Sequence, residues 1–193
     1  MPENLFETQY DLTKKTKLRE FYESKKILIY SSLLSLIIII ASYVYYLERS
    51  EKKKIYLSGN YIEAKVYLER GNETKAIEIL RDVIFSNDPT YSTLSFFMIL
   101  NENLISSKQE VSNLFDHLLE NNKFDKEIRN LLLYKKTLYK SNYVEESKML
   151  EEIKPLLNNK ESVWRSHALL LLGDFYFSRK EYIKAKDFYS EIL

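Results

Sequence analysis

Cysteine is absent from this 193-residue chain, and glycine and proline occur only three times each. Without cysteine the chain has no disulfide, no thiolate nucleophile, no cysteine-ligated zinc and no iron–sulfur cluster, and no lipid can be attached through a thiol. So few chain breakers disfavour an all-β fold, which needs many turns, and favour long helices. A domain without thiols also suits an oxidising compartment.

A large excess of either charge is absent as well. The chain has 29 Lys and Arg residues against 28 Asp and Glu residues, and hydrophobic residues make up 45%. That hydrophobic share indicates a folded rather than a disordered chain. Nucleic-acid-binding proteins usually carry a basic excess, because contacts to phosphate supply most of their affinity. We therefore expect no nucleic-acid partner.

Charge is missing altogether from the twenty-one residues between Ile27 and Leu47. A helix of that length rises about 31 Å at roughly 1.5 Å per residue, which matches the hydrocarbon core of a bilayer. Tyrosine side chains favour the membrane interface. They lie near both ends of the segment, at Tyr30, Tyr43, Tyr45 and Tyr46. The segment 27–47 is therefore predicted to be a transmembrane anchor.

A buried helix and a cleaved signal peptide both fit this segment less well than an anchor does. A buried helix of a soluble protein rarely has four consecutive isoleucines, as Ile37–Ile40 here, with charges gathered at both ends. A cleaved signal peptide has a shorter apolar region followed by a small-x-small cleavage site. In this chain Ala41-Ser42-Tyr43 leads into bulky residues, and 26 residues precede the segment. An uncleaved signal anchor is the better interpretation.

The orientation of the anchor is predicted from its flanking cations. Residues 1–26 form a short tail, whereas residues 48–193 form the bulk of the chain. Both the cation balance and the shortness of the tail favour a cytoplasmic N-terminus and an outer domain over residues 48–193. Six cations precede the anchor and four follow it: Lys14, Lys15, Lys17, Arg19, Lys25 and Lys26, then Arg49, Lys52, Lys53 and Lys54.

Residues 48–193 have the apolar spacing of helices. Apolar residues recur at every third or fourth position, and no run alternates with period two. Turn-forming residues such as Gly71-Asn72 and Asn87-Asp88-Pro89 divide the segment into short helices. An array of antiparallel helix pairs is the natural interpretation. In its middle part the spacing predicts helices near residues 90–105, 108–121, 125–141 and 144–157.

The last helix pair matches a tetratricopeptide repeat, whose unit of about 34 residues needs small residues where its two helices approach. When Ser166 is position 1, Gly173 and Ala185 stand at the two positions that require a small side chain. The positions that interlock hold large residues, namely Leu169, Leu172, Tyr176, Tyr189 and Ile192.

The first pair matches the same repeat when Leu57 is position 1. Ala64 and Ala76 then occupy the two small positions. Asp88 is expected to cap the following helix, with Pro89 in its first turn. The predicted fold class is therefore all-α: an N-terminal transmembrane helix followed by a tetratricopeptide-like α-solenoid of antiparallel helix pairs.

A groove along the first helix of each pair is the expected binding surface. Such a groove mixes apolar and polar side chains and suits an extended peptide or a partner helix. The alternative is a packed or idle surface. The predicted partner-binding residues are His167, Leu170, Asp174 and Phe177 in the last unit, and Ser58, Tyr61, Lys65 and Leu68 in the first.

No catalytic, cofactor-binding or metal-binding residue is predicted, and we expect a protein that is not an enzyme. His117 and His167 lie fifty residues apart without an obvious carboxylate companion, whereas a metal site needs several ligands together. The paired acids Glu145-Glu146 and Glu151-Glu152 alternate with lysines and are interpreted as a solvated helix face. Three scattered glycines cannot form a phosphate-binding loop.

The order of these features resembles one known family. A short charged tail, one anchor and an outer tetratricopeptide domain together look like the YfgM-like ancillary subunit of the bacterial Sec translocon. The resemblance extends over residues 17–193. It includes Asn87-Asp88-Pro89-Thr90-Tyr91-Ser92-Thr93-Leu94, which is similar to the family's Asn-x-x-Thr-Tyr-Gly-x-Leu stretch with Ser92 in place of glycine.

The resemblance implies a non-enzymatic adaptor of protein export in the bacterial inner membrane, with a periplasmic outer domain. Its partners would be Sec translocon subunits and a membrane-anchored periplasmic chaperone of the peptidyl-prolyl isomerase type. The family transfers no catalytic residue. The alternative function is a self-associating scaffold for cell-envelope synthesis or division, which is motivated by the apolar residues Phe188, Tyr189 and Ile192 in the last predicted helix.

Overall fold

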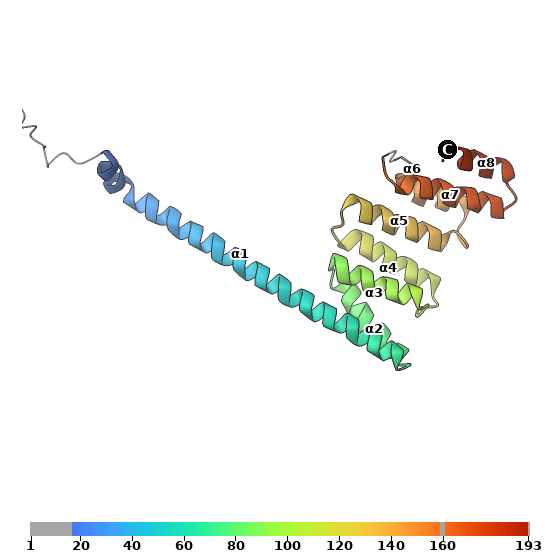
Figure 1. Ribbon diagram of the computed structural model, residues 1–193, viewed down its shortest axis with the longest axis horizontal. Coiled ribbons are helices and arrows are strands. Elements are labelled where there is room, and N and C mark those ends of the chain that lie inside the picture. The colour runs from blue at the N-terminus through green and yellow to red at the C-terminus, as the bar shows by residue number, and fades with distance from the viewer. Residues whose placement is uncertain (1–16, 159–160, 193) are drawn as a thin grey trace, which may run out of the picture. The chain divides into compact units, whose positions relative to one another are not determined.

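The computed structural model describes residues 17–158 and 161–192, which form eight α-helices and no β-strand (Figure 1). The predicted all-α class is therefore confirmed. The helices are α1 (Lys17–Glu69), α2 (Glu73–Phe85), α3 (Pro89–Asn101), α4 (Lys108–Asn121), α5 (Lys126–Lys140), α6 (Glu146–Leu157), α7 (Trp164–Ser178) and α8 (Tyr182–Ser190).

The chain divides into two compact units, one that ends at Lys53 and one that begins at Lys54. Helix α1 contributes to both, because it runs from Lys17 to Glu69. The predicted tail, 1–26, lies outside the described residues up to position 16, and the remainder of it is helical. The second unit contains the last turns of α1 and all of α2 to α8.

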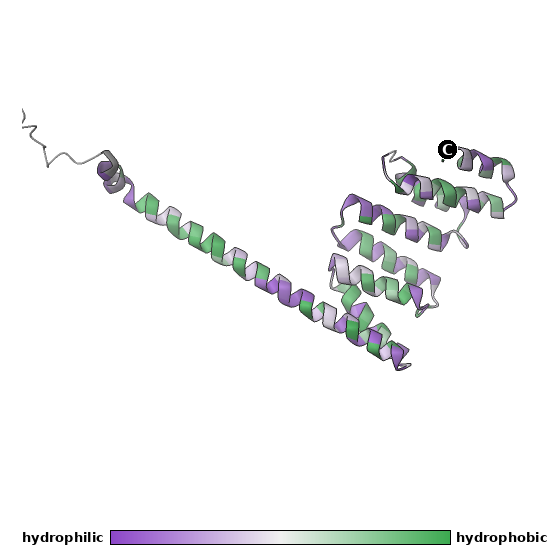
Figure 2. Ribbon diagram, viewed as in Figure 1, coloured by the Kyte–Doolittle hydropathy of each residue, from purple (hydrophilic) through white to green (hydrophobic). Residues whose placement is uncertain are grey.

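The first unit contains an apolar helical segment long enough to cross a membrane, and it is the only such helix among the described residues. Figure 2 shows a continuous run of hydrophobic residues along α1 with hydrophilic residues on either side. Large side chains such as Ile39, which is 64% exposed, have no protein neighbours that would bury them. The hydroxyls of Ser31 and Ser35 donate to the backbone carbonyls of Leu28 (3.0 Å) and Ser31 (3.1 Å), so they add no unsatisfied donor to this surface.

Four helices are followed by a residue with positive φ: Gly71 (76°), Asn87 (55°), Asn103 (52°) and Lys180 (65°). At Asn103 the backbone forms both bonds of a Schellman motif, from Asn103 N to Leu100 O (3.3 Å) and from Leu104 N to Ile99 O (3.0 Å). Helix α3 therefore ends at Asn101, and the prediction that it continues to residue 105 is wrong.

The N-terminus of α3 is capped as predicted. The Asp88 carboxylate accepts hydrogen bonds from the backbone N–H groups of Thr90 (3.0 Å) and Tyr91 (2.9 Å), and Pro89 is the first helical residue. Ser92, which stands where the resembling family has glycine, is fully buried. Its hydroxyl donates to the Val83 carbonyl at 3.0 Å and accepts from the Asp88 N–H at 3.1 Å, so the extra polar group is satisfied.

The second unit has two hydrophobic cores. The first joins the last turns of α1 to α2, α3 and α4, and the second joins α6, α7 and α8 with partly buried residues of α5. Edge-on contact of Phe96 with Phe115, whose ring centroids are 4.4 Å apart, ties α3 to α4 in the first core. Both cores include small residues of the repeat pattern: Ala64 and Ala76 in the first, Ala185 in the second.

Helices α7 and α8 approach closely at Gly173. A Cβ at this position would overlap Cε1 of the Tyr189 ring, closer than real Cβ atoms come to any neighbour. Only glycine therefore fits while the ring keeps its place. The hydroxyl of Tyr189 donates to the Asp174 carboxylate at 2.7 Å, which holds the ring over Gly173.

Candidate functional site

The four residues predicted as partner-binding in the last unit lie on one exposed face of α7. They follow the spacing i, i+3, i+7 and i+10, so a regular helix presents them on one side. Leu170 is 45% exposed and Phe177 is 56% exposed, whereas Ala168 and Leu172 on the other side are buried in the second core. We call His167, Leu170, Asp174 and Phe177 the α7 face; its role in binding stays a prediction.

Aromatic rings connect the α7 face to α5. The Tyr134 ring of α5 lies 5.6 Å from the Trp164 ring and 5.7 Å from the His167 ring, measured between centroids. Burial raises the pKa of the Tyr134 hydroxyl, and the nearby Asp174 carboxylate raises it further. Tyr134 therefore stays protonated and can act as a hydrogen-bond donor beside this face. Neither Tyr134 nor Trp164 was predicted, although Trp164 is the single tryptophan of the chain.

Hydrogen bonding determines the tautomer of His167. Its Nδ1 lies 3.1 Å from the carbonyl oxygen of Val163, which can only accept. The proton is therefore assigned to Nδ1 in the neutral ring, which leaves Nε2 as an acceptor. The α7 face thus combines apolar anchors with one acceptor ring and one carboxylate.

The residues predicted in the first repeat, which lies in the second compact unit, behave differently. Lys65 is exposed, but Tyr61 and Leu68 are partly buried and pack against the first core. These two residues therefore contribute to folding as well as to the surface. In Figure 1 the last turns of α1 and helix α7 lie toward opposite ends of the helices of the second unit, so the two predicted sets do not form one continuous site.

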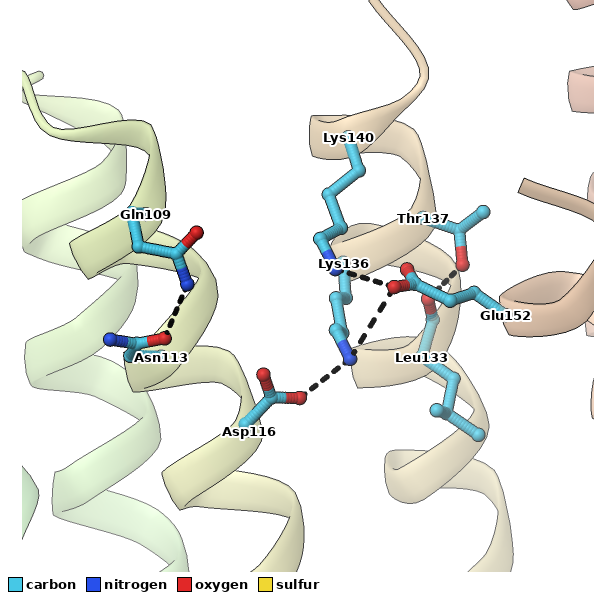
Figure 3. Close-up of polar contacts among 8 residues, drawn as sticks. All are labelled: Gln109, Asn113, Asp116, Leu133, Lys136, Thr137, Lys140 and Glu152. Atoms are coloured by element: carbon cyan, nitrogen blue, oxygen red, sulfur yellow. Dashed lines mark hydrogen bonds and ion pairs between the residues drawn. The ribbon is translucent and has the colours of Figure 1, made fainter. Parts of the chain in front are cut away.

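A polar cleft between α4 and α6 was not predicted. It has a volume of about 710 Å³ and is lined by side chains of α4 and α6 and by the end of α5, among them Lys108, Asp116, Lys140, Tyr143, Glu145 and Glu152. Figure 3 shows Asp116 of α4 directed toward Lys136 of α5, and Gln109 and Asn113 hydrogen-bonded to each other on α4.

Three ammonium groups in or beside this cleft have partners. Lys136 lies 2.5 Å from the Asp116 carboxylate and 3.9 Å from that of Glu152, and Lys140 also pairs with Glu152 (Figure 3). The Lys108 ammonium lies 4.7 Å from the centroid of the Tyr143 ring. The carboxylates offset the charges of Lys136 and Lys140, whereas the contact of Lys108 is with an aromatic ring. The ion pairs connect α4, α5 and α6.

Burial raises the pKa of the Tyr143 hydroxyl to about 12, with smaller contributions from Tyr139 and Glu152. At neutral pH this group is protonated and cannot serve as a general base. Its oxygen is buried without a hydrogen-bond partner among the described residues. The cleft therefore contains no activated nucleophile or base at this position.

Glu146 and His117, which were considered from the sequence as possible site residues, contact different partners and do not form one site. Glu146 accepts from the Tyr176 hydroxyl (2.8 Å) and pairs with Lys184 (3.1 Å), and these contacts, the hydroxyl first, lower its pKa. His117 contacts the Asn87 side chain at 2.9 Å. In the part of the chain that the structure describes, no cluster of three or more His, Asp or Glu residues could hold a metal ion.

Comparison with known proteins adds no relative: no family model, no curated protein and no solved structure matches this chain.

Proposed function

We propose that this chain is a non-enzymatic, membrane-anchored adaptor of the cell envelope that associates with the Sec translocon and a periplasmic chaperone during protein export. The α7 face is the observation that carries the proposal. Exposed Leu170 and Phe177 stand beside His167 and Asp174 on one helix. A surface that combines apolar anchors with a few hydrogen-bonding groups is suited to a peptide or a partner helix.

The second unit is proposed to be a tetratricopeptide-like solenoid. Its support is the packing of the small residues in the repeat pattern. Ala64, Ala76 and Ala185 are buried, and the Tyr189 ring covers Gly173. Helix α7 also packs against both α5 and α6, as the first helix of a repeat packs against the preceding pair.

The apolar segment 27–47 is proposed to cross the bacterial inner membrane once, with the N-terminus in the cytoplasm and residues 48–193 in the periplasm. The flanking cations and the short tail support this orientation. The arrangement would hold the α7 face on the periplasmic side, where emerging chains and chaperones are met.

The proposal is tested by purifying the full-length tagged protein from its own membranes in mild detergent and identifying what remains bound by mass spectrometry. Sec channel subunits together with a peptidyl-prolyl isomerase-type chaperone are expected. Leu170→Asp should reduce their recovery severalfold. Ile62→Asp is the matched control, because Ile62 is similarly exposed (59%) but lies on α1. Absence of every export component from the purified protein would overturn the proposal.

A self-associating scaffold for envelope synthesis or division is the second candidate. The observation in its favour is exposed apolar surface on α8, where Tyr182 is 57% and Ile183 is 81% exposed. The same purification distinguishes the two functions. A scaffold would be recovered as an oligomer of this chain or with division or wall-synthesis proteins, and without export components.

A further inference from the structure

A small apolar groove lies between the C-terminal end of α7 and α8. It has a volume of about 270 Å³ and is lined by Phe177, Tyr182, Ala185, Lys186, Tyr189 and Ser190. The rings of Phe177 and Tyr182, with centroids 5.4 Å apart, form one wall. Both side chains are more than half exposed, so two large aromatic surfaces face solvent at this end of the array.

The preceding helix pair shows which kind of element binds to such a groove. Helices α5 and α6 form the preceding pair, and α7 packs against both of them. The face that α7 inserts carries Ala168, Leu171 and Phe175, which join Met149 and Ile153 of α6 in the second core. The groove between α7 and α8 is the equivalent surface of the next pair, one repeat further along. The geometry of this groove is therefore suited to binding a helix.

The size of the groove supports the same conclusion. Pockets for whole small molecules usually have volumes of about 300–1,000 Å³. A groove of about 270 Å³ lies below that range and suits one or two anchoring side chains of a helix. A helix that lies in an apolar groove places such anchors at i, i+3, i+4 and i+7.

The positive charge at the edge of the groove favours a binding partner that carries a carboxylate over a second copy of this chain. Lys186 is the single charged residue that lines it, and its side chain is exposed. A second copy of this chain, docked symmetrically through the same groove, would bring two Lys186 ammonium groups into one interface. Like charges placed together oppose association, whereas a carboxylate from the occupant would attract Lys186.

We infer that the groove between α7 and α8 docks an amphipathic helix of another protein, which inserts apolar side chains between Phe177, Tyr182 and Tyr189 and presents an Asp or Glu to Lys186. This groove shares Phe177 with the α7 face, but it lies between two helices, whereas the α7 face lies on α7 alone. The inference also does not depend on a role in protein export, because the residues of the groove indicate which kind of helix binds there and not the process in which that helix takes part.

The test is site-specific photocross-linking of the full-length chain in its own membranes, with p-benzoylphenylalanine at Tyr182. The cross-linked product is digested, and the attached peptide is sequenced. The expected peptide belongs to a different protein and lies in a helix with apolar residues at i, i+3 or i+4 and a nearby carboxylate. Lys186→Glu should lower the cross-link yield about threefold and Lys186→Arg should preserve it, as expected for one charge at the edge of an interface.

The probe at Ile62 is the matched control, because that side chain is also exposed (59%) but lies on α1. A cross-link at Tyr182 to a second copy of this chain, to lipid alone, or at a yield no higher than at Ile62 would overturn the inference. So would a heterologous cross-link whose yield Lys186→Glu leaves unchanged. Loss of export components in the purification described above would leave this result unaffected, so the two proposals fail independently.

Discussion

Two glycines inside helices, Gly59 and Gly173, have opposite surroundings. A Cβ at Gly59 would meet nothing within 4 Å, whereas a Cβ at Gly173 would overlap the Tyr189 ring. Glycine inside a helix costs about 1 kcal/mol relative to alanine. At Gly173 the close approach of α7 and α8 offsets that cost, and nothing in the structure explains Gly59.

The two alanine variants should therefore shift stability in opposite directions. Gly59→Ala should raise the free energy of unfolding by about 1 kcal/mol, because it adds helix propensity without a clash. Gly173→Ala should lower it by about 1–2 kcal/mol, because the Tyr189 ring must move and overpacking outweighs the gain in propensity. Urea unfolding of the full-length protein in detergent, followed by circular dichroism, measures both.

Replacing Tyr189 tests the cause of the Gly173 effect. In the Gly173→Ala background, Tyr189→Ala removes the ring that the new methyl group meets, so the two changes together should cost less than their sum. Strict additivity would mean that the ring is not what requires glycine at this position.

Tyr143 gives a prediction that depends on pH. Its buried hydroxyl has no partner among the described residues, so Tyr143→Phe should raise the free energy of unfolding at pH 7 by about 1 kcal/mol. The folded-state pKa is about 12, above the ordinary value of 10.0, so the unfolded chain loses this proton first as the pH rises. Ionisation of this group therefore leaves the free energy of unfolding unchanged below pH 10 and lowers it as the pH rises from 10 towards 12.

The phenylalanine variant should therefore lose less stability than the parent protein between these two pH values. Thermal unfolding measured across that range checks the difference. Tyr56→Phe, at a position that is 67% exposed, is the control and should leave both quantities unchanged. A Tyr143→Phe variant that is less stable at pH 7 would show that the hydroxyl has a bonded partner in solution.

At the scale of helices, the sequence predicted the elements well and their mutual contacts poorly. The Asp88 cap and the Gly71 turn could be predicted because they rest on local backbone chemistry. The end of α3 could not, because the apolar residues Leu104 and Ile105 follow Asn103 and would also suit a longer helix. The contacts of Lys136 with Asp116 and Glu152 join three helices, and no spacing within one helix indicates them.

The ion pairs of Lys136 should contribute to the junction of α4, α5 and α6. Its side chain is only 13% exposed, whereas Asp116 is 41% exposed and can be solvated when its partner is removed. Lys136→Met should therefore lower the free energy of unfolding by about 1 kcal/mol, less than a fully buried pair would. Lys135→Met, which alters the exposed neighbour on the same helix, should change it by less than about 0.5 kcal/mol. Chemical unfolding of both variants gives the comparison, and equal effects would contradict a role for the ion pairs.

At the scale of the whole molecule, composition predicted the long apolar helix, but the repeat pattern identified only some of the exposed residues that could bind a partner. The α7 face could be located from sequence because one regular helix carries all four residues. Tyr134 could not, because its place beside His167 depends on how α5 meets α7. The groove between α7 and α8 was missed for the same reason, since Phe177 and Tyr182 come from different helices.

Membrane retention of the whole chain should depend on the apolar strength of residues 27–47. Six Ile, five Leu and one Val make twelve strongly apolar residues in this segment. At about −0.3 to −0.6 kcal/mol each, they favour insertion by about 4 to 7 kcal/mol, whereas one central arginine opposes it by about 2.5 to 3.5 kcal/mol. Ile37→Arg alone should therefore leave the protein in the membrane, and Ile37→Arg with Ile40→Arg should release much of it.

Extraction of membranes with alkaline carbonate separates the two outcomes. The control is Ile62→Arg, which places the same charge on α1 outside the apolar segment, at a side chain that is 59% exposed. It should leave retention unchanged, even when combined with Ile37→Arg. If the double variant in the apolar segment remains fully retained, the second unit holds the chain at the membrane by binding a membrane partner or lipid. If the single variant is already released, the segment is a weaker anchor than its twelve apolar residues predict.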